Sequence, residues 1–333
     1  MVPAWANPIE TVERVNGWAA ADLDGDGDAD LALATEWGPV RVFRNDDGQF
    51  TERTDALGLA DYRGWWNGVA MIDANNDGRF DLVATNWGRN SFYETLLREE
   101  GGESRLALFV GDVDGNGTVE QLEAVRVGDR WLPVRDRHAL EKGLPDLRSR
   151  FPVHAAMVKA GIEGIAGPAF ERLKKMEVNQ LDTTLFINHG DRFESVPLPM
   201  EVQLTPAFSV CVGDVDADGN DDLFFSQNFF AVRPEDPRND AGTGLWLLGH
   251  GDGTFRALKP SESGVKVYGE QRGAALADFD RDGRVDLVVT QNAAATRLFR
   301  NQAETKGVRV SFGGEGEGVQ ARLVYADGTK GPV

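Results

Sequence analysis

The sequence has few of the residues that link small secreted domains together or anchor proteins in membranes. Its single cysteine, Cys211, lies in the apolar run Phe208–Val212, so we predict a buried thiol, and no disulfide can form within the chain. No stretch approaches the roughly eighteen apolar residues that a membrane-spanning helix needs. The first residues, Met1–Asn7, lack the charged start and apolar core of a signal peptide. We therefore expect either a chain whose export signal was removed or a piece of a longer protein.

Basic residues are also scarce. Lys and Arg number 35 against 54 Asp and Glu, and the net charge of −19 argues against a nucleic-acid-binding surface. No histidine is paired with a cysteine or a second histidine at a ligand spacing, so no transition-metal site is expected, and each histidine is predicted to be exposed or in a turn. The histidines are His138, His154, His189 and His250. Neither a Gly-x-Ser-x-Gly nucleophile elbow nor a phosphate-binding glycine loop occurs, although a Ser-His-Asp arrangement stays open.

What the sequence does have is one acidic nine-residue loop that occurs five times. Loops one to five are residues 22–30, 73–81, 112–120, 214–222 and 278–286. Each has Asp at place one, Asp or Asn at places three and five, Gly at place six, and Asp or Glu at place nine. Alternate oxygen-bearing side chains around a glycine turn converge on one point, where a hard divalent cation neutralises them. We therefore predict five structural Ca²⁺ sites.

The predicted calcium ligands are the side chains at places one, three, five and nine, together with the backbone carbonyl of place seven. They are Asp22, Asp24, Asp26, Asp28 and Asp30 in loop one; Asp73, Asn75, Asp77, Arg79 and Asp81 in loop two; Asp112, Asp114, Asn116, Thr118 and Glu120 in loop three; Asp214, Asp216, Asp218, Asn220 and Asp222 in loop four; and Asp278, Asp280, Asp282, Arg284 and Asp286 in loop five. Weak sites of this kind fill where calcium is near millimolar, which favours an extracellular, periplasmic or cell-surface location.

Apolar strands flank every loop and predict an all-β fold. After each loop come a short apolar strand, a turn and a further pair of strands that ends in a glycine hairpin. We assign the hairpins 42–50, 185–193, 247–255 and 298–301 to loops one, three, four and five. Four-stranded antiparallel units repeated around an axis are the blades of a β-propeller. The prediction is a β-propeller of four-stranded antiparallel blades, five of them motif-bearing and six or seven in all, to which the two chain ends could add a blade.

The long gap between loops three and four breaks the strand pattern. Over residues 136–177, helical patterning predicts short helices at His138–Lys142, Val153–Ile162 and Phe170–Met176. We interpret this region as a small helical insertion in the third blade that packs on one rim or, alternatively, binds a partner. The predicted domains are a calcium-binding propeller over residues 1–301 and a β tail over residues 302–333 that packs on the propeller or closes it.

The acidic loops resemble the FG-GAP or VCBS repeats of integrin α-subunit propellers and of many secreted bacterial proteins, from about Trp18 to Asn301. Segments 84–88, 111–118 and 198–203 are similar to bacterial members whose propeller precedes an ASPIC/UnbV segment, relatives of cartilage acidic protein. The tail resembles the start of that segment and stops at Val333, earlier than in members of the family, which suggests a partial chain. The resemblance implies a calcium-stabilised extracellular propeller used for adhesion or recognition.

A ligand-binding face is predicted opposite the acidic loops. The turns and links that emerge there hold aromatic, amide and arginine side chains, which suit a sugar or a peptide. The candidates are Arg63, Trp65, Trp66, Asn86, Trp87, Asn90, Gln203, Asn228, Gln271, Arg272 and Asn292. Trp18, Trp37 and Trp87 are more readily explained as core, since propeller blades pack with aromatic residues. Trp65 and Trp66 are adjacent in an extended segment, so they cannot both be buried on one face.

The predicted function is recognition or adhesion, in which the calcium-stabilised propeller binds a protein or a glycan, with no nucleic-acid partner and no membrane span. One alternative is a carbohydrate-active enzyme on a propeller scaffold, a lyase or glycosidase, which needs paired acid and base groups. Outside the loops, Arg63, Glu201, Glu270 and Arg272 are too few to assign such roles, so no catalytic residue is predicted. The other alternative is a passive structural module of a larger surface protein. The sequence indicates no oligomeric state.

Overall fold

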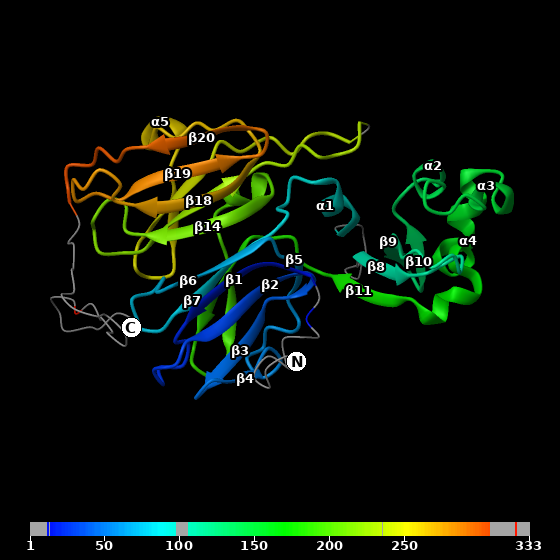
Figure 1. The fold of residues 1–333 in the computed structure, drawn as a ribbon, viewed down its shortest axis with the longest axis horizontal. Helices are drawn as coiled ribbons and strands as arrows, with labels where there is room; N and C mark the ends of the chain where they lie inside the picture. Colours follow the sequence, from blue (N-terminus) through cyan, green and yellow to red (C-terminus); the bar gives the residue numbers. More distant parts are fainter. Residues whose placement is uncertain (1–11, 13, 98–105, 235, 307–323, 325–333) are drawn as a thin grey trace. The chain divides into compact units, whose positions relative to one another are not determined.

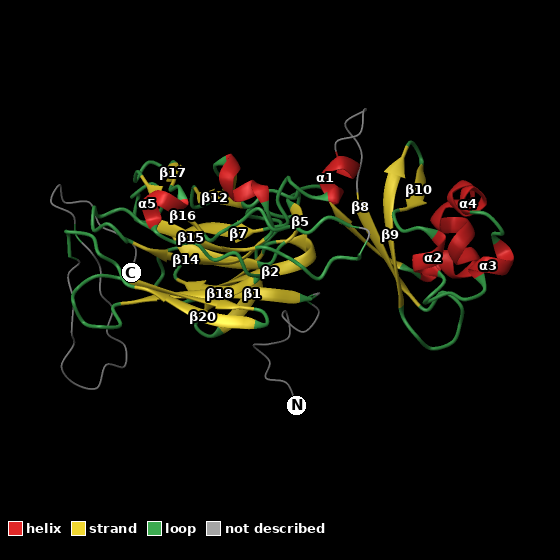
Figure 2. Cartoon of the chain, turned by 90° about the horizontal axis from the view of Figure 1, so that it is seen from above, coloured by secondary structure: helices red, strands yellow, loops and turns green. Residues whose placement is uncertain are grey.

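The computed structural model describes residues 12, 14–97, 106–234, 236–306 and 324. The chain divides into two compact units: the first unit comprises Met1–Ser91 and Leu181–Val333, and the second unit comprises Phe92–Gln180. The first unit consists mostly of strands, whereas most of the helical residues belong to the second (Figures 1 and 2). Within the described residues, no helix is both long enough and apolar enough to cross a bilayer.

The first unit contains four antiparallel sheets, which we number one, two, four and five after the acidic loops that they carry. Sheet one is β1 (Val15–Ala21), β2 (Asp30–Pro39), β3 (Arg41–Asp46) and β4 (Gln49–Glu52), with β5 (Arg63–Trp65) paired to the far end of β2. Sheet two is β6 (Gly68–Ile72), β7 (Asp81–Thr85), β12 (Thr184–Asn188) and β13 (Phe193–Pro197). Sheet four is β14 (Ala207–Gly213), β15 (Asp222–Gln227), β16 (Leu245–Gly249) and β17 (Phe255–Ala257). Sheet five is β18 (Gln271–Ala277), β19 (Asp286–Gln291) and β20 (Ala294–Phe299).

Turn chemistry and strand composition explain these sheets locally. The β3–β4 hairpin turns at Asp47 and Gly48, whose φ angles of 51° and 82° are those of a type I′ turn, which matches the twist of the flanking strands. The second and third strands of sheet two, β7 and β12, are buried at every residue. Such strands read as continuous apolar runs because both of their faces pack against neighbouring layers.

Apolar layers between successive sheets form the core of the first unit. The main side chains are Trp66, Phe186 and Phe193 between sheets one and two; Ile72, Leu185 and Phe225 between sheets two and four; and Phe224, Trp246 and Leu287 between sheets four and five. The first strands of the sheets lie beside one another in the order β1, β6, β14 and β18 (Figure 1). The four sheets therefore follow one another face to face in chain order.

The second unit has its own sheet, sheet three, and its own core. Its strands β8 (Leu106–Gly111), β9 (Glu120–Val127), β10 (Arg130–Pro133) and β11 (Lys174–Val178) are ordered β10-β9-β8-β11. The helices are α1 (Phe92–Leu97), α2 (Arg137–Leu140), α3 (Leu147–Arg150) and α4 (His154–Ala166), followed by a 3₁₀-helix (Gly167–Arg172). Met157, Ile162 and Ile165 of α4 pack with Phe109 and Leu122 of the sheet. Loop three, at the β8–β9 connection, therefore belongs to this second unit.

The pairing in sheet two corrects the predicted assignment of the 185–193 hairpin. Leu185 of β12 pairs with Val83 of β7, so this hairpin completes the sheet of loop two and not that of loop three. The second unit is inserted between these two strands, and an ion pair between Arg89 and Asp182 closes the base of the insertion. Because the partner strands are far apart in the sequence, no local pattern indicates that they pair.

The predicted helical insertion is also corrected in part. Residues 136–177 contain α2, α3, α4 and the 3₁₀-helix, but the predicted helix at Phe170–Met176 is wrong beyond Arg172. There the chain becomes β11, which pairs with β8, and its apolar residues Met176 and Val178 alternate with charged ones. This alternation suits a strand at a sheet edge better than a helix. The predicted β tail lies outside the described residues, apart from 302–306 and 324.

Candidate functional site

All five acidic loops are tight connections between two antiparallel strands, which confirms their predicted placement. They join β1 to β2, β6 to β7, β8 to β9, β14 to β15 and β18 to β19. The glycine at place six has a left-handed φ in every copy, from 82° to 99°. Place four is left-handed as well, and it holds Asn76, Ala217 and Arg281 in loops two, four and five, with φ of 56°, 59° and 64°. The sequence did not predict this second left-handed position, which glycine occupies only in loops one and three.

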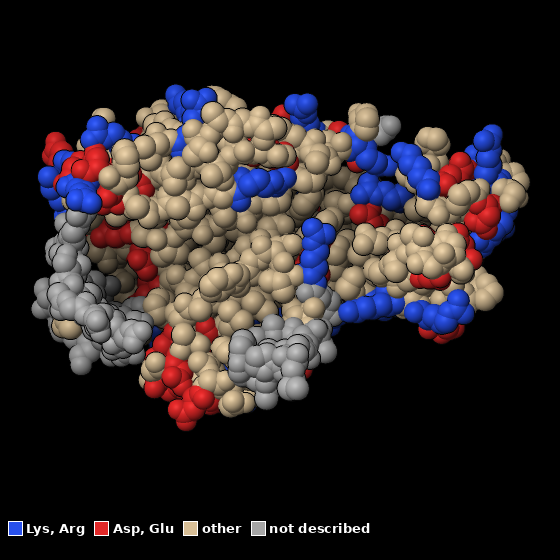
Figure 3. Space-filling model, viewed as in Figure 1, with Lys and Arg blue, Asp and Glu red and all other residues tan. Residues whose placement is uncertain are grey.

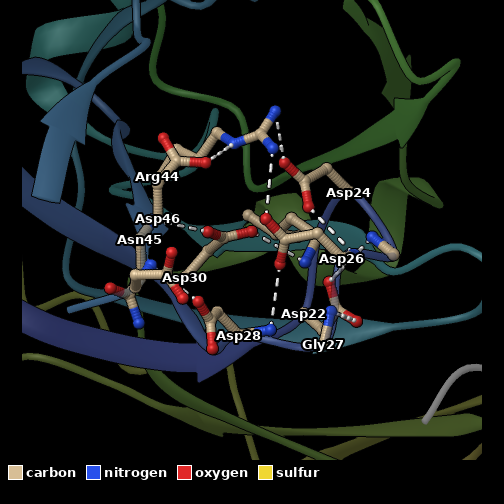
Figure 4. A network of polar contacts seen from close by, with 12 residues as sticks. Asp22, Asp24, Asp26, Gly27, Asp28, Asp30, Arg44, Asn45 and Asp46 are labelled. Atoms are coloured by element: carbon tan, nitrogen blue, oxygen red, sulfur yellow. Dashed lines mark hydrogen bonds and ion pairs between the residues drawn. The ribbon is translucent and has the colours of Figure 1, made fainter. Parts of the chain in front are cut away.

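Backbone N–H groups of each loop hold the carboxylate at place one. In loop one, Asp22 Oδ1 accepts hydrogen bonds from the N–H groups of Gly25 and Asp26 at 2.7 and 3.1 Å, and its Oδ2 accepts one from Gly27 at 2.9 Å (Figure 4). The place-one carboxylates of the other loops accept from the N–H groups of places five and six in the same way. The loop backbone thus wraps around its first carboxylate.

The carboxylate at place nine closes each loop from the other side. It is buried in all five copies, and one of its oxygens accepts the N–H of place two at 2.8 to 3.2 Å. In the four sheets of the first unit, its other oxygen accepts an N–H from the end of the third strand, donated by Asn45, Asn188, Gly249 or Asn301 at 2.7 to 2.9 Å. Place nine therefore ties three strands of a sheet to the loop.

Oxygen atoms converge in four of the five loops. One carboxylate oxygen from each of three residues lies within 4.8 Å of the others in loops one, three, four and five. The groups are Asp22, Asp24 and Asp30; Asp112, Asp114 and Glu120; Asp214, Asp216 and Asp218; and Asp278, Asp280 and Asp282. Loop two has an amide, Asn75, at place three, so fewer carboxylates gather there. An all-oxygen donor set of this kind fits a hard cation such as Ca²⁺.

Arginine side chains contact several of these carboxylates. Arg44 Nη1 lies 2.6 Å from Asp24 Oδ2 and Arg44 Nη2 lies 3.1 Å from Asp26 Oδ2 (Figure 4). Arg300, at the equivalent position of sheet five, pairs with Asp280. Arg79 and Arg284, at place seven, each pair with the place-five carboxylate of their own loop, which the sequence did not predict. These guanidinium groups partly balance the loop charge.

Burial raises the pKa values of three place-nine carboxylates, those of Asp30, Asp81 and Asp222. Desolvation raises the pKa of Asp30 to about 6 and the pKa values of Asp81 and Asp222 to about 7, and the neighbouring loop carboxylates raise them further. Backbone N–H donors oppose this effect without cancelling it. In the metal-free protein, these buried groups are therefore difficult to ionise.

We expect the metal-free protein to lose stability as the pH rises from about 4 to about 7. The folded-state pKa values of Asp30, Asp81 and Asp222 lie above their unfolded value of 3.8, so the folded state binds more protons in between. This stabilisation is complete below the unfolded pKa and is lost as the pH passes the folded pKa values, which amounts to about 1 to a few kcal/mol. Urea unfolding in chelator-treated buffers measures it. Stability that increased with pH over this interval would contradict the burial argument, and a calcium-saturated series is the control.

Aromatic side chains gather at the strand ends that lie away from the acidic loops. Trp37 lies near the end of β2, Trp87 follows β7, and Phe229 follows β15. Trp65 lies just before β6, which leads to loop two, and Phe208 lies at the start of β14, which leads to loop four. Neighbouring ring centroids in the order Trp37, Trp65, Trp87, Phe229 and Phe208 are 5.2, 4.6, 5.1 and 6.0 Å apart. We call these five residues the aromatic row. It joins sheets one, two and four, about 20 Å from the loops.

Arg272 extends the aromatic row to sheet five. Its guanidinium carbon lies 3.8 Å from the ring centroid of Phe208 and 5.4 Å from that of Phe229. The buried carboxylate of Glu270 pairs with Arg272 and also accepts hydrogen bonds from Phe230 N–H at 3.1 Å and Asn292 Nδ2 at 2.7 Å. Burial lowers the pKa of Arg272, and its Nη1 has no hydrogen-bond partner among the described residues. The rest of the half-buried guanidinium, over the aromatic rings, can contact an acceptor group of a ligand.

The predicted ligand-face residues separate into two groups. Trp65, Arg63 and Arg272 are half-buried, and Asn90 and Asn292 are exposed. The buried members are Trp66, Asn86, Trp87, Gln203, Asn228 and Gln271. The amides among them bond to backbone groups, as when Asn228 exchanges two hydrogen bonds of 2.8 Å with Gly242. These amides therefore support the loops beneath the face.

The structure also gives the burial of the other tryptophans discussed above, of the histidines and of the cysteine. Trp37 is buried as expected, at a bulge of β2 where its φ of 61° is left-handed. Trp18 was expected in the core, but 68% of it is exposed on β1, the edge strand of sheet one. The four histidines are exposed, as predicted. Cys211 is half-buried, its thiol donates to Ala274 O at 3.0 Å, and burial raises its pKa to about 11.

The charge distribution separates the two ends of the strands. Asp and Glu atoms gather below β1 and β2 and beside the β18–β19 connection, whereas the surface between them is mainly uncharged (Figure 3). The acidic loops thus lie at the ends of their sheets and leave the aromatic row outside the most negative region. A ligand at the row does not have to approach the carboxylates.

Comparison with known proteins agrees with the loop pattern. Residues 22–84, which include loops one and two, match the family model of the FG-GAP-like repeat. The chain is 27% identical over 305 residues to cartilage acidic protein 1 of Xenopus tropicalis and 24% identical over 323 residues to the human protein of that name. These matches cover 87% and 88% of this chain but 42% of each relative, so the chain spans about two fifths of the length of the curated relatives it matches. The chain thus carries an FG-GAP-like repeat and is distantly similar to cartilage acidic protein 1.

Proposed function

We propose that the first unit is a calcium-stabilised recognition module of an extracellular or cell-surface protein, and that it binds a protein or glycan at the aromatic row. The observation that carries this proposal is the separation of the two features along the same strands. Carboxylates occupy one end of each strand pair, and the row with Arg272 occupies the other. The FG-GAP-like match and the similarity to cartilage acidic protein 1 support an extracellular or surface setting.

The proposed architecture is a β-propeller in which the sheets of the first unit are successive blades. Face-to-face packing, first strands side by side and a repeated loop between the first two strands of each sheet support it. Calcium at the ligands predicted for loops one to five would hold the strands together at one end. The carboxylates of each loop would otherwise repel one another.

The aromatic row has the chemistry of a recognition surface. Trp65 and Trp87 are nearly parallel, with an interplanar angle of 16°, and half-buried Trp65 offers ring surface for stacking. Half-buried Arg272 lies over the rings of Phe208 and Phe229, and the exposed side chains of Asn90 and Asn292 add amide groups. Apolar stacking together with a few directed polar groups is what a sugar or an extended peptide requires. The supporting amides beneath fix the loops that carry these groups.

Arg272→Ala is expected to weaken ligand binding about tenfold or more, because an interface arginine that is held rigidly contributes strongly. The calcium-loaded protein is first screened on a glycan array and against extracellular-matrix proteins, and the affinity of each ligand found is then measured. Arg41→Ala is the matched control: Arg41 also lies over an aromatic ring, Phe43 at 5.4 Å, and pairs with a carboxylate, Glu52, but away from the row. Equal affinities of the wild type and Arg272→Ala would contradict the location of the site.

A further inference from the structure

The place-two residues of the loops bond in two directions. Each donates its N–H to the place-nine carboxylate of its own loop, as Leu23 does to Asp30 at 2.9 Å and Val215 does to Asp222 at 2.8 Å. In the first unit, the place-two carbonyls of loops one, two and four also accept a hydrogen bond from the next sheet. One peptide segment therefore contacts both its own loop and the neighbouring sheet.

The donors in the next sheet follow one rule. Asn188 Nδ2 of sheet two donates to Leu23 O of loop one at 3.0 Å, and Asn301 Nδ2 of sheet five donates to Val215 O of loop four at 2.7 Å. Between sheets two and four, the Gly253 N–H donates to Ala74 O of loop two at 2.8 Å. Each bond reaches the loop of the preceding sheet.

The same donors are tied to their own loops. The backbone N–H of Asn188 donates to Asp81 at 2.7 Å, and that of Asn301 donates to Asp286 at 2.8 Å. Gly253 shares a tight hairpin with Gly249, whose N–H donates to Asp222 at 2.9 Å. A path of hydrogen bonds and short backbone segments thus runs through the four place-nine carboxylates, from loop one to loop five.

Loops two and four also contact each other directly. Asn76 Nδ2 donates to Asn220 Oδ1 at 2.8 Å, and the Asp73 N–H donates to Asp221 Oδ2 at 3.3 Å. Asn76 is at place four of its loop, and Asp73 is a predicted ligand. A change in the backbone of one loop therefore alters the hydrogen bonds of the other.

We infer that the four loops of the first unit bind calcium cooperatively, because hydrogen bonds through Asn188, Gly253 and Asn301 join each loop to the next. When calcium orders one loop, it also orders the place-two carbonyl, which accepts a hydrogen bond from the next sheet. By linkage, calcium in the loop of that next sheet favours binding in the first loop to the same extent. Nearest-neighbour terms of this kind govern other repeat proteins. Loop three, which belongs to the second unit, fills independently. This inference rests on the proposed calcium binding.

Calcium titration by calorimetry tests the coupling. The background protein carries Asp112→Asn and Asp114→Asn, which remove calcium binding at loop three. Only the four loops of the first unit then bind calcium. We expect a Hill coefficient of about 2 or more in this background. Asn188→Ala and Asn301→Ala should each lower the coefficient and weaken the mean affinity about fivefold. The double variant keeps the contacts between loops two and four, so its coefficient should fall below that of either single variant but stay above 1.

Asn45→Ala is the matched control. Asn45 has the same position in sheet one, and its N–H donates to Asp30 at 2.8 Å, but its Nδ2 donates to Ala29 O of its own loop at 3.1 Å. The control should keep the Hill coefficient of the background. A coefficient of about 1 in the background, or equal losses in Asn45→Ala and Asn188→Ala, would overturn the inference.

The outcomes also separate the coupling from the proposed function. Calcium that raises the melting temperature but fills the sites independently refutes the coupling alone. Calcium that leaves the melting temperature unchanged refutes both. If the buried Asn188 cannot be replaced without unfolding the protein, the Asn301→Ala variant tests the coupling instead, because Asn301 is half-buried. That variant removes the bond to Val215 O and the bond that Asn301 Oδ1 accepts from the Ala303 N–H.

Discussion

Removal of calcium is expected to lower the melting temperature of the first unit by more than about 10 °C. A ligand at a hundred times its Kd stabilises the native state by about 2.7 kcal/mol for each site, and 1 kcal/mol shifts the melting temperature of a domain of this size by about 2 to 4 °C. The first unit carries four of the five loops. The size of the shift follows from the relief of carboxylate repulsion in several loops at once.

Thermal unfolding followed by circular dichroism, with EDTA and again after calcium is restored, measures this shift. Asp214→Asn, Asp216→Asn and Asp218→Asn together remove the carboxylates that converge in loop four. In this triple variant, calcium should raise the melting temperature by about 5 to 10 °C less than in the wild type, which is the contribution of one site. Neutralising three exposed carboxylates outside the loops, Asp55, Asp191 and Asp240, is the charge-matched control. If both triple variants changed the calcium response equally, general charge screening and not site binding would explain it.

Trp66→Ala is expected to destabilise the first unit by about 3 to 5 kcal/mol. Trp66 is completely buried between sheets one and two, where its ring centroid lies 5.8 Å from that of Phe186. Its indole N–H has no hydrogen-bond partner among the described residues, so Trp66→Phe loses packing volume but no hydrogen bond. Chemical denaturation should therefore place Trp66→Phe between the wild type and Trp66→Ala.

The adjacent Trp65→Ala variant should show the opposite combination of effects. Trp65 is half-buried and stacks on Trp87 at 4.6 Å, so its loss should cost less than half the stability lost in Trp66→Ala. Binding of any ligand found in the screen should weaken about tenfold or more, because the middle of the aromatic row is removed. Ligand affinity that followed stability in both variants would show that the row is only core.

The sequence predicted the acidic loops well because their information is local. Oxygen-bearing side chains at fixed places and a glycine at place six determine the turn and its flanking strands. The roles of Asn45, Asn188 and Asn301 were less accessible, although all three lie in recognisable hairpin segments. Their bonds to place nine, and for two of them to a neighbouring loop, depend on how strands distant in the sequence pack.

The burial of the polar residues predicted for the ligand-binding face could not be predicted from local sequence either. Asn86, Gln203, Asn228 and Gln271 are expected at the surface from their polarity, yet all four are buried with their amides bonded to loop backbone. Conversely, Trp18 is exposed although tryptophan is mostly buried. Position in the sheet decides these cases, and residue type alone does not. The sequence left open which of Trp65 and Trp66 is buried, whereas the structure ends β5 at Trp65, paired with Glu36 of β2, and buries Trp66.

The insertion of the second unit has a consequence for synthesis on the ribosome. Strand β7 ends at Thr85, but its partner β12 begins only at Thr184. At translation rates of about 5 to 20 residues per second, the intervening stretch takes on the order of ten seconds to emerge. During that interval β7 presents an unpaired apolar edge, which is the kind of edge that invites pairing with another chain. A nascent chain halted before Thr184 should therefore be the species most prone to aggregate and most dependent on chaperones.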